Sequence, residues 1–162
     1  MIAARTNGRP INIGDLLLNH LQNEGVSPTS RAEVGPLFIQ RHGPEAIAEL
    51  MRACLTGDVR VIFDGVRLSL TCRAIVAQLP KSQVWVVRAT PENCRRRLSN
   101  RLRDTGVDAT EIDRLLERAS TYDREQIDIE CMANAFLAND GSVECLAHQV
   151  DDAIRTHLAS HS

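Results

Sequence analysis

The sequence predicts an α/β fold, in which helices cover both faces of a mostly parallel sheet to give three layers, α/β/α. Its short apolar runs lack the polar alternation of half-exposed strands, so both faces of each strand are expected to be buried. Helical patterns separate these runs, as parallel pairing requires. With 162 residues, 43% hydrophobic and 25% charged, the chain has the size and balance of one globular domain spanning residues 1–162.

In the first half of the chain, apolar periodicity predicts two strands and the helices between them. Apolar side chains from Ile47 to Leu55 recur at the spacing of one helix face, and Gly57 ends that helix. Val59–Phe63 is a nearly continuous β-branched run of strand length, closed by Asp64-Gly65. The remaining expected elements are a strand at 11–13, a helix carrying Leu16, Leu17 and Leu21, a short helical stretch within 27–43, and a short helix from Cys72 to Leu79.

The second half repeats this alternation with clearer helix-capping signals. Residues 84–87 and 135–138 are buried-type strands. Thr90 is expected to cap a helix with Pro91 in its first turn. The threonine hydroxyl can accept a hydrogen bond from a free backbone N–H of that turn, and proline has no backbone N–H that needs a partner. Thr110 and Ser142 are expected to cap two further helices, at 112–119 and 143–158.

Composition excludes several classes of protein. The 19 basic and 21 acidic residues nearly cancel, unlike in a nucleic-acid coat or a membrane-surface binder, and five aromatic residues are too few for a base-stacking platform. No apolar run reaches the length of a membrane span, and Met1–Pro10 lacks the apolar core of a signal peptide. The five cysteines are expected to be reduced and core-type in a cytoplasmic protein, and the histidines show no metal-ligand spacing.

Ligands of parallel sheets bind beyond the carboxyl ends of the strands, so the residues there are the candidates for chemistry. Asp64 is the leading one, because a carboxylate at the end of a buried strand can hold Mg²⁺ where phosphate oxygens arrive. An N-cap of the following helix explains the same residue equally well. Asn139-Asp140-Gly141, after the last strand, is expected to be a structural turn.

Arginine density is the second candidate feature. The chain has 18 arginines and one lysine, Lys81, and residues 95–124 contain eight arginines against six acids. Arg97 and Arg101 lie one helical turn apart, as do Arg114 and Arg118, and such pairs can clamp a polyphosphate with bidentate forks. A solvated helix face in a chain that prefers arginine to lysine would look the same.

Five segments, in order, resemble the P-loop nucleoside and nucleotide kinases, particularly the deoxynucleotide and dephospho-coenzyme A kinase-like branch. VRVIFDGVR resembles the Walker-B strand, and VWVVRATPENCRRRLSNRLR resembles the fourth strand, its helix and the start of the lid. The similarity covers roughly residues 11–155, with a lid-like segment at about 95–124, and its other pieces are INIGDLL, RAEVGPLFIQRHGPEAIAEL and FLANDGSVECLAHQV.

This resemblance implies a P-loop NTPase-like fold, ATP and Mg²⁺ as ligands, and a nucleoside or nucleotide as the small-molecule partner. Asp64 would lie near Mg²⁺, and Arg97 and Arg101 would take part in catalysis. The other implied residues are Arg103 and Arg118 as phosphate-binding groups, and Asp15, Arg31 and Arg67 at the border of the substrate.

Two departures bear on mechanism. No GxxxxGK[ST] loop occurs, and Lys81 lies in a turn without a glycine loop, so the phosphate cradle and its lysine are missing. Leu18 stands where nucleotide kinases often carry a substrate arginine.

The family's first strand, which lies between the strands ending at Phe63 and Val87, is missing too. Without it, those two strands would have to pair directly, or another segment would have to fill the gap. That segment could be Met1–Arg5, a strand from a second copy or a partner chain, or sequence from an upstream start. We therefore expect a kinase-like protein impaired in phosphate transfer, or an inactive regulatory or partner-binding relative. A structural α/β protein of an unrelated family is the third reading that the sequence leaves open.

Overall fold

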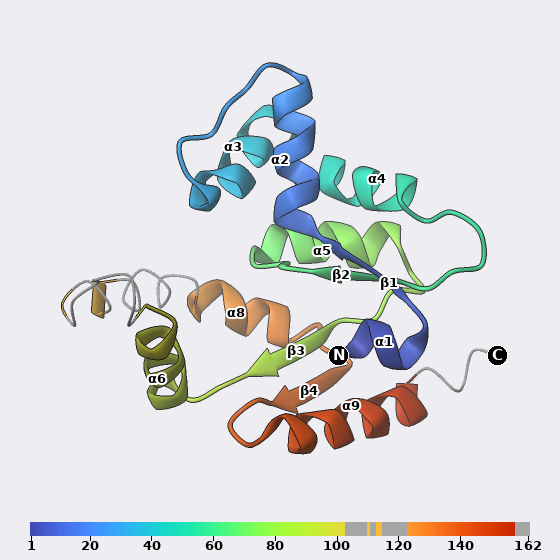
Figure 1. Ribbon diagram of the computed structural model, residues 1–162. Helices are drawn as coiled ribbons and strands as arrows, with labels where there is room; N and C mark the ends of the chain where they lie inside the picture. Colours follow the sequence, from blue (N-terminus) through green and yellow to red (C-terminus); the bar gives the residue numbers. More distant parts are fainter. Residues whose placement is uncertain (103–109, 111–112, 115–122, 158–162) are drawn as a thin grey trace. The chain divides into compact units, whose positions relative to one another are not determined.

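The computed structural model describes residues 1–102, 110, 113–114 and 123–157 (Figure 1). The chain divides into two compact units, Met1–Gln83 and Val84–Ser162. Both combine helices with a short pair of parallel strands, so the α/β class is confirmed. The predicted single domain and its three layers stay predictions. None of the described helices is long and apolar enough to cross a membrane.

The first unit contains one strand pair and most of the helices. β1 (Arg9–Asn12) runs parallel to β2 (Val61–Asp64), with Arg9 opposite Val61 and Asn12 opposite Asp64. The helices are α1 (Ile2–Thr6), α2 (Ile13–Asn23), the short 3₁₀ helix η1 (Arg31–Glu33), α3 (Val34–His42), α4 (Glu45–Ala53) and α5 (Ser69–Gln78).

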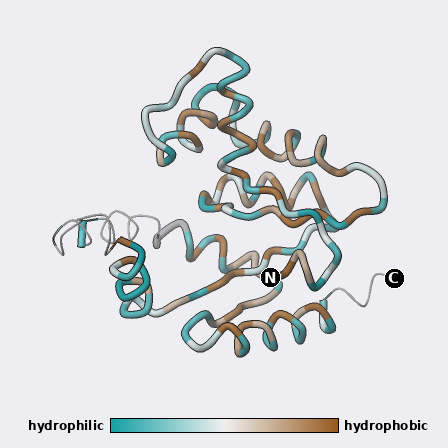
Figure 2. The backbone as a smooth tube through the Cα atoms, in the orientation of Figure 1, coloured by the Kyte–Doolittle hydropathy of each residue, from teal (hydrophilic) through white to brown (hydrophobic). Residues whose placement is uncertain are grey.

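Apolar faces of these helices form the core of the first unit. Leu21 and Ile47 are fully buried, and Phe38 is only 1% exposed. Figure 2 shows hydrophobic and hydrophilic residues alternating along the helices, as in elements that bury one face. The core cluster consists of Ile13, Leu17, Leu21, Val34, Phe38, Ile47, Ala48, Met51 and Ile75.

The second unit is built around β3 (Trp85–Arg88) and β4 (Ala135–Ala138), which pair in parallel. Its helices are α6 (Pro91–Leu102), α8 (Asp123–Glu130) and α9 (Val143–His157). Gln149 of α9 acts like an extra strand residue on β4: its Oε1 accepts from the Ala138 amide at 2.7 Å, and its Nε2 donates to the Ala138 carbonyl at 2.9 Å. This side chain satisfies backbone groups that an edge strand would leave open.

Most predicted elements are present, with shifted ends. The bounds of the strand at 135–138 are confirmed, but its side chains alternate between buried and exposed, so the expectation that both faces are buried is wrong. The capping roles of Thr90 and Ser142 are confirmed, since their hydroxyls accept from the Asn93 and Cys145 amides at 3.3 Å. The helix expected to reach Gly57 ends at Ala53. The helix expected at 112–119 lies almost wholly outside the described residues.

Among the described residues, two α-helices were not predicted. Met1–Arg5, considered as a strand that could complete the sheet, instead contributes to α1. α8 follows the lid-like segment, where no element was expected. The described strands form two parallel pairs, one in each unit.

Candidate functional site

The carboxyl ends of β1 and β2 form the first part of the candidate site. Asn12 and Asp64 are the last residues of their strands and lie opposite each other. The Asn12 side chain accepts a hydrogen bond from the Asp15 amide at 3.1 Å and so caps α2. Gly65 follows with a φ of 94°, a conformation in which a side chain is strained, so glycine is required where the chain leaves β2.

Asp64 does not cap the next helix, which excludes one of its two explanations. α5 begins at Ser69 with Leu68 in the N-cap position. Asp64 is exposed, and within the described residues no group donates a hydrogen bond to its carboxylate. A role near Mg²⁺ therefore stays a prediction that its exposure and chemistry allow.

Asp15 and Arg31, both predicted at the substrate border, contact each other. Arg31 of η1 donates from Nη1 to Asp15 Oδ1 at 2.7 Å, and its Nη2 also donates to this oxygen. Asp15 lies in the first turn of α2, where the helix dipole favours a carboxylate. Because both side chains are more than half exposed, the pair contributes at most about 1 kcal/mol to stability.

Arg67, the third predicted substrate residue, lies between β2 and α5, three positions after Asp64. Its side chain is exposed and makes no hydrogen bond or ion pair with any described residue. The first unit thus carries an aspartate and an arginine without internal partners, next to the strand ends that the fold class singles out for ligands.

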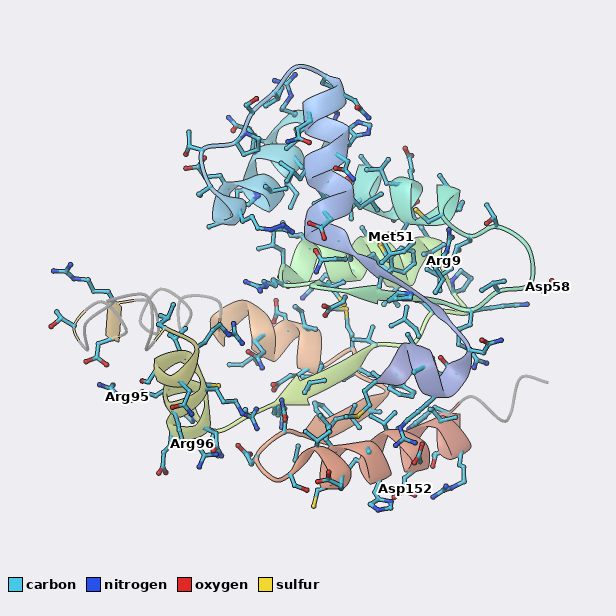
Figure 3. All side chains as sticks on the ribbon, viewed as in Figure 1. Arg9, Met51, Asp58, Arg95, Arg96 and Asp152 are labelled. Carbon is cyan, nitrogen blue, oxygen red and sulfur yellow. The ribbon has the colours of Figure 1, made fainter. Side chains whose placement is uncertain are left out.

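The predicted phosphate-binding arginines belong to the second unit. Arg97 and Arg101 both lie on α6, one turn apart as expected. Arg95 and Arg96, labelled in Figure 3, also lie on α6. Both have local partners: Arg95 pairs with Asp113, and Arg96 donates to the Asn93 side chain at 2.5 Å. These pairs favour the interpretation of that part of α6 as a solvated helix face over its interpretation as a phosphate clamp. Arg103 and Arg118 lie outside the described residues.

Asp140 links the loops that follow β3 and β4. Its Oδ1 accepts from the Thr90 amide at 2.7 Å, the Asn93 side-chain amide at 2.9 Å and the Thr90 hydroxyl at 3.0 Å. These hydrogen bonds, first that of the Thr90 amide and then that of Asn93, lower the pKa of Asp140, and the charge of Arg97 adds to the effect. The turn at Asn139–Gly141 is therefore structural, as predicted, with partners that sequence spacing could not assign.

We expect Asp140→Asn to remove part of the acid sensitivity of the protein. A carboxylate with a lowered pKa stabilises the fold above the usual aspartate range, and this contribution is lost as the pH falls through the folded-state pKa. The variant should have the lower urea midpoint at neutral pH, and its difference from wild type should shrink as the pH falls below the usual aspartate pKa. Urea titrations between about pH 3 and about pH 7 measure this. Asp58→Asn, at an exposed position, is the control, and its urea midpoint should follow that of wild type at each pH. If the urea midpoint of Asp140→Asn also followed wild type at each pH, the proposed stabilisation by the Asp140 carboxylate would be contradicted.

Arg88, at the carboxyl end of β3, is held from two sides. Its Nε donates to Glu130 Oε1 at 2.8 Å, and its guanidinium lies 4.3 Å from the centroid of the Phe136 ring. The hydrogen bond from Arg88 is the main reason why the pKa of Glu130 is lowered. Since both of its partners come from its own unit, Arg88 acts as a structural link between β3, α8 and β4.

Histidine and cysteine placement corrects two expectations. Glu24 lies between His20 and His42, with its Oε1 3.3 Å from His20 Nε2 and its Oε2 3.1 Å from His42 Nε2. The histidines were expected to show no metal-ligand arrangement, yet these three residues offer one. All five cysteines are free, but only Cys72 is buried, where burial raises the pKa of its thiol; Cys94, Cys131 and Cys145 are exposed.

Comparison with protein-family models gives no match for this chain, and comparison with curated protein sequences gives none.

Proposed function

We propose that this chain is a relative of the P-loop nucleoside and nucleotide kinases and that its 162 residues are impaired in phosphate transfer. The strand pairing is the observation that carries the proposal. β1 pairs with β2 and β3 with β4, all in parallel. In the family that the sequence resembles, the first strand lies between the counterparts of β2 and β3. A kinase sheet without that strand would leave two such pairs.

The missing phosphate loop is the reason for proposing impaired transfer. Phosphoryl transfer in this class depends on backbone amides and a lysine that hold the phosphates of ATP. The sequence contains no GxxxxGK[ST], and its single lysine, Lys81, lies in the turn closed by the Ser82 amide and the Leu79 carbonyl at 2.8 Å. This turn precedes β3 and leads into no helix, so it offers no substitute for the loop.

Features of the first unit support binding of an anionic acceptor. Arg67 is exposed, and Arg31 is held beside the start of α2 by Asp15. Guanidinium groups bind phosphates through paired hydrogen bonds, and both arginines are accessible for this. Leu18 packs against the core of the unit, so the substrate arginine common at this position has no counterpart here.

We expect the protein to bind a nucleoside monophosphate without turning over Mg·ATP. Calorimetric titration of the full chain with nucleoside monophosphates should show binding that Arg67→Ala weakens about tenfold, equivalent to a charged hydrogen bond of ~1.4 kcal/mol. Arg60→Ala, at an exposed arginine before the opposite end of β2 that also has no side-chain partner among the described residues, is the matched control and should bind as wild type. ATP turnover above background would contradict the impairment. Tight Mg·ATP binding that is lost in Asp64→Ala would show a working donor site instead.

A partner-binding role is the second candidate, and exposed apolar side chains on the strands favour it. Val87 of β3 and Phe136 of β4 are 48% and 49% exposed, and Val59, just before β2, is 54% exposed. Two-stranded sheets are marginal alone, so a strand from a second copy or another protein would stabilise them. If no nucleotide binds while the chain self-associates in sedimentation experiments, this role replaces the first.

A further inference from the structure

The ends of α2 and α3 bring three metal-binding side chains together. His20 lies in the last turn of α2, Glu24 follows directly as its C-cap residue, and His42 is the last residue of α3. One ligand atom from each residue lies within 4.8 Å of the other two. Histidine nitrogen and carboxylate oxygen are the ligands that zinc and its neighbours in the first transition series prefer.

The distances within this cluster fit a bound ion. Zinc holds nitrogen and oxygen ligands at about 2.0–2.1 Å, so two ligand atoms of a tetrahedral site lie about 3.3 Å apart. Glu24 already contacts both histidines, since Oε1 is 3.3 Å from His20 Nε2 and Oε2 is 3.1 Å from His42 Nε2. Binding an ion requires side-chain rotations that bring three ligand atoms, now within 4.8 Å of one another, to about 3.3 Å.

The core fixes the two imidazole rings. Phe38, which is only 1% exposed, has its ring centroid 5.5 Å from that of His20 and 4.7 Å from that of His42. The two imidazoles themselves lie at 5.3 Å and 88°. Ligands held by packing lose little freedom when a metal binds, which raises the affinity.

A pocket of about 290 Å³ adjoins the cluster. Both histidines line it, together with Phe38, Ala46, Glu49 and Leu50. A site with three protein ligands keeps a fourth position for water or a small ligand, and here that position would face a cavity large enough for either. Among the contacts described for Glu24, a bound ion would displace one charged neighbour besides the histidines. This neighbour is Arg41, whose Nε lies 3.5 Å from Glu24 Oε2.

We propose that His20, Glu24 and His42 bind a divalent transition metal, Zn²⁺ by the chemistry of the ligands, with the fourth coordination position open to the adjoining pocket. The ion would cross-link the C-terminal ends of α2 and α3. This site is independent of the nucleotide-binding proposal.

Calorimetric titration of the full chain with Zn²⁺ tests the site. Wild type should bind one ion, and His42→Gln, His20→Gln or Glu24→Gln should each weaken binding about tenfold or more. Co²⁺ should give the visible d–d bands of a four- or five-coordinate ion without thiolate charge transfer, since the proposed ligands include no cysteine. His148→Gln, an exposed histidine on α9, and a triple serine variant at Cys94, Cys131 and Cys145 should bind as wild type.

Thermal melts followed by circular dichroism distinguish loss of a ligand from loss of the fold. Zn²⁺ should raise the melting temperature of wild type but not that of Glu24→Gln, whose far-ultraviolet spectrum should match wild type. Absence of Zn²⁺ binding by wild type would overturn the proposal. Binding that survives in all three ligand variants but is lost in the cysteine variant would overturn it too, because the ion would then sit on the thiols.

Discussion

Replacing Phe38 with alanine is expected to lower the free energy of unfolding by about 3–5 kcal/mol, out of a typical total of roughly 5–15 kcal/mol. Phe38 is 1% exposed and belongs to the cluster that joins α2, α3 and α4. Alanine would leave a cavity that rigid helices on each side fill only in part. Urea denaturation followed by circular dichroism measures the change.

Leu55→Ala is the matched control for this prediction. Helical periodicity placed Leu55 on the buried stripe with Met51, but the helix ends at Ala53 and leaves Leu55 44% exposed. Its truncation should change stability by less than about 0.5 kcal/mol. Equal effects of the two substitutions would mean that the apolar stripe continues past Ala53, as the sequence suggested.

Phe38→Ala should also weaken Zn²⁺ binding in the fraction that stays folded, because the ring packs on both imidazoles.

Local pattern was sufficient where one face of an element is clearly apolar. The strand at 135–138 and the start of α6 behind Thr90 follow directly from short-range chemistry. α8 was missed because its sequence, DREQIDIE, has only two apolar residues and they are two positions apart, which is strand-like spacing. In the structure Ile129 is 8% exposed and Ile127 is 62% exposed, so the helix buries little and shows little periodicity.

The candidate site shows a different limit of sequence analysis. Residue types were recognisable, but their pairing depends on contacts over long stretches of chain. Arg31 reaches back 16 positions to Asp15, His42 reaches back 18 to Glu24, and Thr90 meets Asp140 across 50. The spacing of His20 and Glu24, four apart on one helix, was the available signal for the metal cluster; its third member could not be inferred without the packing of α3 on α2.

The strand pairing also shows what stabilises each short sheet. The pair of β1 and β2 lies in the first unit, whose helices form a core of their own. In the pair of β3 and β4, the Gln149 side chain hydrogen-bonds to the backbone amide and carbonyl of Ala138 at the edge of β4. Parallel strands usually depend on burial of both faces, yet Val87 and Phe136 are about half exposed. These strand faces therefore leave apolar surface exposed within the described residues.

Leu137→Ala should destabilise the second unit by about 2–5 kcal/mol. Side chains of β4 alternate, so that Ala135 and Leu137 are buried while Phe136 and Ala138 are exposed. Leu137 is 2% exposed and lines a pocket of about 450 Å³ beside Gln149 and Ala153 of α9, which its truncation would enlarge. Chemical denaturation followed by the fluorescence of Trp85, the only tryptophan, reports on this unit.

Phe136→Ala removes the larger side chain one position away and should nevertheless cost less. Phe136 is 49% exposed, and its main described contact is with the guanidinium of Arg88, 4.3 Å from the ring centroid, worth about 0.5–1 kcal/mol at an exposed site. If the register of β4 were shifted by one residue, the two faces would exchange and the order of the two effects would reverse. A larger loss for Phe136→Ala would thus contradict the pairing of Val86 with Phe136 and of Val87 with Leu137, on which the parallel arrangement of the second unit rests.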